Sequence, residues 1–135
     1  MSAYAEQNNV QIQQAVQRAH ELAIEHGITL ATAESLTGGD LAGTICTVSG
    51  ASAYFMGGVV SYASSVKASV LGVSETLLAQ AGSVDARVAQ QMAAGAARVC
   101  DASYALSTTG VAGPEPHTYS ISISKMVSIL KNRIR

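Results

Sequence analysis

The chain has 135 residues, of which 48% are hydrophobic and 13% charged, and its formal net charge is −1. This length supports a single core, and the composition favours a packed globular domain over a disordered chain. The small net charge offers no general attraction to nucleic acid, and no apolar run approaches the ~20 residues that span a bilayer. Because the polar segment 1–10 also lacks a signal-peptide pattern, we expect a cytoplasmic protein that contacts neither membrane nor nucleic acid.

Helical and strand patterns alternate along the chain. Apolar residues recur at three- and four-residue steps over residues 8–26, which predicts a helix that ends before a left-handed Gly27. The apolar run 28–33 predicts a buried strand, and we expect a helix over about 37–47 to follow it. The further expected elements are strands over 54–62 and 102–107 and helices over 64–71, 75–81 and 85–99.

Glycines and small side chains refine these elements. Gly57 and Gly58 lie inside an expected strand, where paired glycines indicate a bulge or a close backbone approach. We expect Asp85 to cap the helix that runs to Val99, and the many alanines of that helix permit close packing against a neighbour. The order of the elements is that of an α/β domain, for which we predict three layers.

Two polar, glycine-rich turns each follow an expected strand, one over residues 35–39 and the other over 108–114. In α/β sheets ligands bind beyond the carboxyl ends of the strands, so parallel neighbouring strands would bring both turns to one edge. The backbone N–H and hydroxyl groups of such turns are suited to an anionic ligand. Neither turn matches the P-loop or the dinucleotide fingerprint.

Three residues are candidates for chemistry. Ser35 lies between a strand and a helix start, where a serine is commonly only an N-cap; the alternative is a nucleophile, which needs a base. Lys67, the only lysine before residue 125, is that base if burial lowers its pKa, and otherwise a solvated side chain. Tyr62 is either an ordinary aromatic at a strand end or a group that donates to, or stacks on, a ligand.

The cysteines and histidines indicate no metal site. Cys46 and Cys100 have no partner at metal-ligand spacing, and His20, His26 and His117 form no spaced cluster. We therefore expect no bound metal and interpret both cysteines as small core residues.

The character of the chain changes near its end. Residues 1–117 contain nine acidic and four basic residues, whereas residues 118–135 contain four basic residues and no acidic ones. Alternation over 119–123 predicts a strand, and 126–134 fits a basic helix. This tail is either an ordinary terminal strand and helix or a segment of different origin, such as one read in a shifted frame, and the residues alone leave both open.

Several motifs gain meaning when they are taken together. The motif Thr-Ala-Glu-Ser-Leu-Thr-Gly-Gly stands at 32–39, and Thr-Gly-Val-Ala-Gly-Pro stands at 109–114. Between them lie matching segments at 50–55, 57–62, 67–73 and 81–84. In order and spacing, residues 10–116 resemble the CinA C-terminal domain family, the nicotinamide-nucleotide amidohydrolases.

The resemblance implies a fold, a reaction and a site. The implied fold is a three-layer α/β/α arrangement with a mixed sheet, and the implied reaction hydrolyses the carboxamide of nicotinamide mononucleotide to nicotinate mononucleotide and ammonia. Ser35 would be the nucleophile, assisted by Lys67 and Tyr62, with a small-molecule nucleotide as partner and no cofactor. The implied substrate-binding residues are Glu34, Thr37, Gly38, Gly39, Gly58, Thr109, Gly110 and Gly113.

The resemblance ends near residue 116, after which the family's usual Arg-bearing segment, last strands and last helix have no counterpart. We therefore expect a domain over 1–117, an atypical basic tail over 118–135, and a fold without the usual last strand or strands and helix. Two functions remain open: an active nucleotide amidase, or a catalytically impaired binding or interaction domain. The low charged share and the sheet edge left uncovered favour a homo-oligomer.

Overall fold

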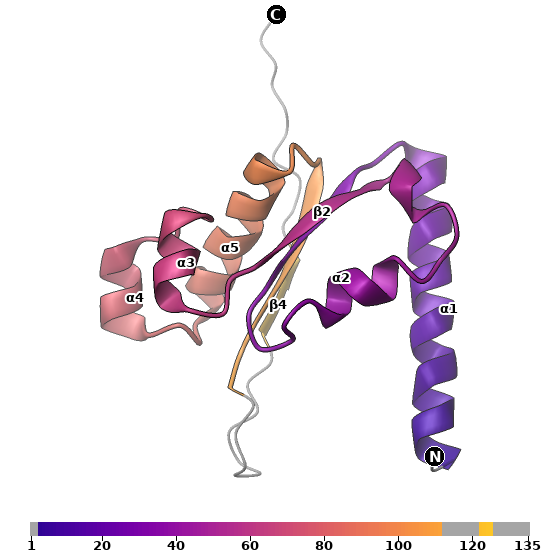
Figure 1. Ribbon diagram of the computed structural model, residues 1–135, viewed down its shortest axis with the longest axis horizontal. Coiled ribbons are helices and arrows are strands. Elements are labelled where there is room, and N and C mark those ends of the chain that lie inside the picture. Colours follow the sequence, from indigo (N-terminus) through magenta and orange to yellow (C-terminus); the bar gives the residue numbers. More distant parts are fainter. Residues whose placement is uncertain (1–2, 112–121, 126–135) are drawn as a thin grey trace, which may run out of the picture.

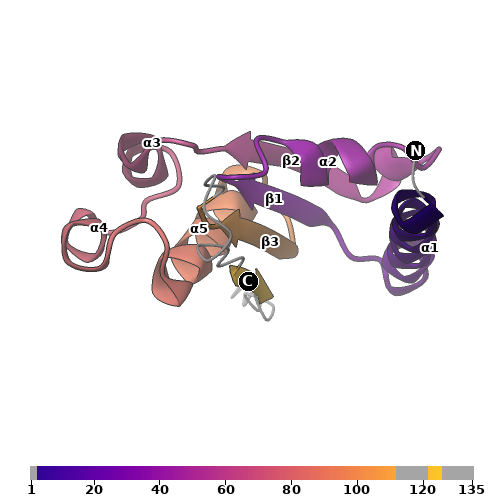
Figure 2. The ribbon, with the colours of Figure 1, turned by 90° about the horizontal axis from the view of Figure 1, so that it is seen from below.

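A four-stranded mixed sheet lies between two groups of helices in the computed structural model, which describes residues 3–111 and 122–125 (Figure 1, Figure 2). The strands are β1 (Leu30–Glu34), β2 (Phe55–Val60), β3 (Tyr104–Thr109) and β4 (Ser122–Lys125), in the spatial order β2-β1-β3-β4. β1 is parallel to both β2 and β3, whereas β4 is antiparallel to β3. The prediction of a mixed sheet is therefore confirmed.

The helices form the two outer layers. They are α1 (Ala3–His26), α2 (Asp40–Ile45), the short 3-10 helix η1 (Ala51–Ala53), α3 (Ser64–Ser69), α4 (Glu75–Ala81) and α5 (Ala86–Val99). Figure 1 places α3, α4 and α5 on one side of the sheet and α1 and α2 on the other. The predicted three-layer α/β/α arrangement is confirmed.

Side-chain alternation along β1 separates two apolar cores. Ala31 and Ala33 face α5 and are buried against Met92. Leu30 faces the opposite layer, where it packs against Tyr54. Successive residues of β1 therefore point toward different helical layers, as a pleated strand requires.

α5 packs very closely on the segment that joins α3 to α4. A Cβ at Gly95 would overlap the backbone of Leu71, so only glycine permits this approach. The side chain of Asp85 accepts a hydrogen bond from Arg87 N at 2.7 Å and caps the helix. The predicted close packing and the predicted cap are both confirmed.

Glycines also shape the start of the sheet. Gly27, with a φ of +60°, ends α1 while Ile28 N donates to Ala23 O at 3.0 Å, as in a Schellman motif. The β1–β2 register shifts between Leu30 and Ala31, next to the glycine pair of β2. A Cβ at Gly58 would overlap Thr32 Oγ1. The expected end of α1 at Gly27, the bulge in β2 and the close backbone approach at Gly58 are all present.

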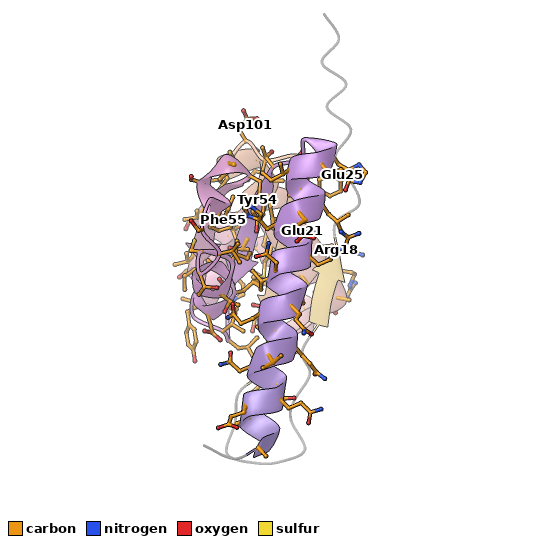
Figure 3. All side chains as sticks on the ribbon, turned by 90° about the vertical axis from the view of Figure 1, so that its right-hand side faces the viewer. Arg18, Glu21, Glu25, Tyr54, Phe55 and Asp101 are labelled. Carbon is orange, nitrogen blue, oxygen red and sulfur yellow. The ribbon has the colours of Figure 1, made fainter. Side chains whose placement is uncertain are left out.

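α1 packs loosely on the rest of the domain. Most of its side chains project away from the sheet, and Tyr54 lies beside it (Figure 3). The ring of His20 meets the ring of Tyr54 edge to face, with centroids 5.3 Å apart. Although α1 is long, neither it nor any other helix in the described ranges has the apolar stretch that crossing a membrane requires.

Some boundaries differ from the expected ones. α1 begins at Ala3, five residues before the predicted start. The prediction missed these residues because the first turns of the helix are polar and have no apolar periodicity. α2 begins at Asp40 rather than near residue 37, because Gly38 and Gly39 have φ angles of +59° and +106° and cannot belong to a right-handed helix.

The interpretation of the cysteines as core residues is wrong for Cys46, which is exposed at the end of α2. Cys100, which follows α5, is partly buried and packs against the core between that helix and the sheet.

Candidate active site

The carboxyl ends of three strands meet at one edge of the sheet. In the register of the sheet, Glu34 lies opposite Val60 on one side and opposite Thr108 on the other. Ser35 follows β1, Tyr62 lies two residues beyond β2, and Gly110 follows β3. The turn 35–39 and the described part of the second turn, residues 108–111, therefore lie at the same edge, as predicted.

Lys67 lies directly against Ser35. It projects from α3 and donates a hydrogen bond from Nζ to Ser35 Oγ at 2.9 Å. Nζ also donates to Ser61 O at 2.7 Å and to Tyr62 O at 3.0 Å. The loop after β2 thus holds the amine, and α3 aims it at the residue that follows β1.

Lys67 is completely buried, and no salt bridge to it is found among the described residues. Burial lowers the pKa of its ammonium group, since a low-dielectric site disfavours the charged form. The geometry suits the neutral amine equally well. Two N–H groups donate to the two carbonyl oxygens, and the lone pair then faces Ser35 Oγ. The solvated interpretation of Lys67 is therefore wrong.

Ser35 is not a helix cap. The N-cap of α2 is Gly39, four residues later. Ser35 N donates to Thr108 O at 3.0 Å, which fastens the residue to β3, and only 6% of its surface is exposed. The hydroxyl is thereby held beside Lys67, at the end of the sheet.

Glu34 points to the other side of the strand and is almost fully enclosed. Its Oε1 accepts hydrogen bonds from Leu41 N at 2.7 Å and from Thr37 Oγ1 at 2.8 Å, and its Oε2 accepts from Ala42 N at 3.0 Å. Thr37 Oγ1 also lies 2.7 Å from Thr108 Oγ1. The Glu34 carboxylate therefore occupies the N-terminus of α2, and that helix end is closed to an anionic ligand.

A small cavity of about 180 Å³ opens beside Ser35. Its lining residues follow the ends of the three strands or lie in the loop between α4 and α5: Ser35, Leu36, Tyr62, Ser83, Gly110 and Val111. Tyr62 is 74% exposed, so its ring stands at the rim rather than beneath the serine. A larger hollow of about 740 Å³ lies between α1 and residues 47–49 and includes no residue of this site.

Leu36 supplies the most suitable oxyanion donor. Its N–H group, the first after Ser35, has no hydrogen-bond partner within residues 3–111 and 122–125. The N–H groups of Thr37 and Gly39 are also unpaired there, whereas Gly38 N donates to Ser35 O at 3.1 Å. A donor one residue beyond a nucleophile is well placed for a developing oxyanion.

The remaining predicted binding residues have different surroundings. Thr109 is buried and donates to Ser83 O at 2.6 Å. Gly58 lies in the middle of β2 against Thr32, away from the strand end. Gly110 lines the cavity, and Gly113 lies outside the described residues.

Sequence reasoning missed two contributors: Ser61, whose carbonyl oxygen accepts from Lys67, and Ser83, which lines the cavity. The free N–H group of Leu36 is one of the backbone groups near Ser35 that the family resemblance implies as an oxyanion hole. The signal for Ser83 was its place in the matching segment 81–84. Backbone groups such as those of Ser61 and Leu36 give no signal in side-chain chemistry. Within the described part of the chain, no three His, Cys, Asp or Glu side chains gather as metal ligands would.

Fold and site together define an α/β domain that carries a buried serine–lysine pair at the carboxyl edge of a mixed sheet. The chain belongs to the CinA C-terminal domain family, whose model matches residues 12–124. This match extends past residue 116, where the motifs end, and includes the first three residues of β4. It also crosses the expected boundary at residue 117, which stays a prediction.

Individual relatives agree with this assignment. A CinA-like protein of Frankia casuarinae is 58% identical over 95 residues, which cover 70% of this chain and 22% of the relative. A CinA-like protein of Geobacter metallireducens is 50% identical over 91 residues, again 22% of its length. The chain therefore spans about a fifth of the curated relatives that it matches.

Solved structures have the same fold. The competence/damage inducible protein CihA of Agrobacterium tumefaciens superposes with a TM-score of 0.76 at 30% identity, over 85% of this chain and 79% of that one. The competence damage-inducible protein A (ComA) of Klebsiella pneumoniae also gives a TM-score of 0.76, at 28% identity, over 85% and 81% of the two chains. Both comparisons match the α/β arrangement described above.

Proposed function

We propose that this chain hydrolyses the carboxamide of nicotinamide mononucleotide, with Ser35 as the nucleophile. The observation that carries the proposal is the hydrogen bond of 2.9 Å between Lys67 Nζ and Ser35 Oγ. A buried amine of lowered pKa is a suitable base for a serine hydroxyl. The substrate itself comes from the family resemblance and is the part that experiment must test.

Acylation would use the pair as nucleophile and base. Lys67 takes the Ser35 proton while Oγ attacks the carboxamide carbon, which gives a tetrahedral intermediate. The Leu36 N–H group stabilises the negative oxygen of that intermediate. The intermediate collapses when Lys67 returns the proton to the leaving nitrogen, which breaks the C–N bond and releases ammonia.

In deacylation Lys67 would again be the base, and Ser35 would be the leaving group. Lys67 removes a proton from water, and the resulting hydroxide attacks the ester carbon of the acyl-serine. Collapse of the second intermediate breaks the C–Oγ bond, returns the proton to Ser35 and releases nicotinate mononucleotide. The carbonyl oxygens of Ser61 and Tyr62 keep the amine in place through both half-reactions.

The cavity fits the reacting end of such a substrate. A volume of about 180 Å³ holds a pyridine ring and its carboxamide rather than a whole nucleotide, so the ribose and phosphate would lie outside, along the rim at Tyr62 and Gly110. Among the described residues, the N–H groups of Thr37 and Gly39 in the neighbouring turn are also unpaired, and such groups are suited to an anion.

One observation favours the second candidate, a catalytically impaired binding or interaction domain, over an active amidase. Among the described residues that line the cavity, none is an arginine, a lysine or a histidine. A phosphate anchor of ordinary strength would use such a cation. Arg133 and Arg135 lie outside the described residues.

Ammonia release from nicotinamide mononucleotide separates the two candidates. We would compare the wild-type chain with Ser35→Ala, and use Ser52→Ala, an exposed serine on η1, as the matched control. Release by the wild type and by Ser52→Ala but not by Ser35→Ala would support the amidase. Equal release by Ser35→Ala would contradict it. Calorimetric binding of the nucleotide without any release would favour the binding domain.

We also infer that the chain forms a homo-oligomer and that it is cytoplasmic. The low charged share and the exposed apolar side chains Met56, Val60 and Val70 support self-association. Sedimentation of the purified chain tests the first inference, because a monomeric mass over the micromolar range would contradict it.

A further inference from the structure

The side chain of Glu34 immediately precedes the candidate nucleophile and yet does not reach the cavity beside it. It is 1% exposed, and it is absent from the cavity lining. Because residues alternate along a strand, Ser35 faces Lys67 in the α3 layer while Glu34 faces α2. A buried carboxylate that touches no ligand surface requires another explanation.

The side chain of Glu34 is hydrogen-bonded to the turn 35–39 and to the start of α2. Three donors reach its two oxygens: the N–H groups of Leu41 and Ala42, and the hydroxyl of Thr37. The turn 35–39 thus begins at the backbone of Glu34 and returns to its side chain. No salt bridge to Glu34 is found among the described residues, so hydrogen bonds alone stabilise the carboxylate.

The same network reaches the other two strands. Thr37 Oγ1 has one proton, which it donates to Glu34, and it therefore accepts the proton of Thr108 on β3. The main-chain oxygen of Glu34 accepts from Ser61 N at 2.7 Å. Ser61 in turn accepts from Lys67 through its own carbonyl oxygen. Glu34 is therefore connected by hydrogen bonds to β3 through Thr108, and to Lys67 through Ser61.

We propose that Glu34 is a positioning residue, whose buried carboxylate fixes the 35–39 turn so that Ser35 and the Leu36 N–H group face the cavity. This inference rests on the proposed function and replaces the expectation that Glu34 binds the substrate.

Glu34→Gln is the decisive substitution, because it keeps the shape and removes one acceptor. The amide nitrogen of glutamine would face an N–H group of Leu41 or Ala42, and the turn would lose one of its attachments. We expect kcat for ammonia release to fall about 100-fold with KM changed less than about twofold, since misplacement affects the chemical step. Hydrogen exchange of the amides of residues 35–42 should become faster.

Two further variants keep the test decisive. Ser74→Ala removes the side-chain cap of α4, which accepts from Leu77 N at 3.2 Å, and should leave both kcat and the exchange of residues 35–42 unchanged. Thr37→Val removes the hydroxyl link and substitutes for Glu34→Gln if that variant does not fold.

A rise in KM alone would overturn the proposal and return Glu34 to substrate binding. Unchanged kcat and exchange would also overturn it. If the wild type releases no ammonia, the proposed function fails, while the exchange rates still decide whether Glu34 holds the turn.

Discussion

Lys67 Nζ lies 2.9 Å from Ser35 Oγ, although the two residues are 32 positions apart in the sequence and strand β2 lies between them. The amine has no carboxylate partner among the described residues, and its other two hydrogen bonds go to the carbonyl oxygens of Ser61 and Tyr62. Neutral carbonyl groups hold a lysine in place without stabilising its charge as strongly as a carboxylate would. This arrangement favours proton transfer over a structural ion pair.

Substitution of Lys67 should abolish turnover while the nucleophile stays in place. We expect Lys67→Met to lower kcat by about 10²–10⁴-fold, the usual contribution of a general base. Lys67→Arg should be equally inactive, because a guanidinium group does not lose its proton in proteins. Ammonia release with nicotinamide mononucleotide measures both, alongside Ser52→Ala. Retention of more than a tenth of the wild-type rate by either variant would exclude Lys67 as the base.

The close approach of Gly58 to Thr32 gives a prediction about stability. Gly58→Ala places a methyl group against Thr32 Oγ1 and should lower the free energy of unfolding by about 1–3 kcal/mol through overpacking. Thr32 Oγ1 is buried and has no hydrogen-bond partner among the described residues, so Thr32→Ala alone should change stability by less than about 1 kcal/mol.

The double variant Thr32→Ala/Gly58→Ala should recover most of that loss. Urea unfolding of the four proteins measures the coupling, which we expect to be about 1–2 kcal/mol in favour of the double variant. Strict additivity of the two single changes would show that the methyl group meets some other obstacle.

Local patterns in the sequence predicted most of the fold. Apolar periodicity, the stop at Gly27 and the cap at Asp85 each depend on neighbours along the chain, and each agrees with the structure. The start of α2 did not follow from such rules. Its N-terminus is satisfied by Glu34, a residue from the preceding strand, and this contact depends on how the turn 35–39 folds back.

The candidate site was predictable as a set of residues but not as a geometry. Ser35 and Lys67 were identified through the family resemblance, while position alone favoured a cap and a solvated lysine. The contact between them requires parallel pairing of β1 with β2 and the short loop before α3. The identity of the side chains does not predict that Lys67 is buried or that the N–H group of Leu36 is unpaired among the described residues.

Ser83 gives a test of the cavity that does not touch the serine–lysine pair. Ser83 belongs to the lining, and the hydrogen bond that it accepts from Thr109 uses its carbonyl oxygen. Ser83→Phe should fill the cavity of about 180 Å³ and lower kcat/KM for the nucleotide by about tenfold or more. Ser83→Ala is the matched control and should stay near the wild-type value. The melting temperature should change little in either variant. If Ser83→Phe leaves kcat/KM unchanged, the substrate binds elsewhere.

The burial of Lys67 makes a separate prediction for the dependence of stability on pH. Burial lowers the pKa of Lys67 in the folded chain from its ordinary value of 10.5. Between the lowered pKa and 10.5 the unfolded chain holds a proton that the folded chain lacks. The free energy of unfolding therefore gains from this group as pH rises through that window, by at most about 1.4 kcal/mol per pH unit, and the gain is lost as pH falls through the folded pKa.

Two other groups act in the opposite direction. Burial raises the pKa of Tyr54 and of Cys100 in the folded chain, so each favours folding at lower pH and loses that contribution as pH rises. The difference between the wild type and Lys67→Met cancels both, because the variant keeps them. Urea unfolding of the two proteins from about pH 7 to 9.5 should give a difference in unfolding free energy that moves in favour of the wild type with increasing pH. Parallel curves would mean that Lys67 keeps its ordinary pKa in the folded chain, and a serine attack assisted by its neutral amine would then lose its physical basis.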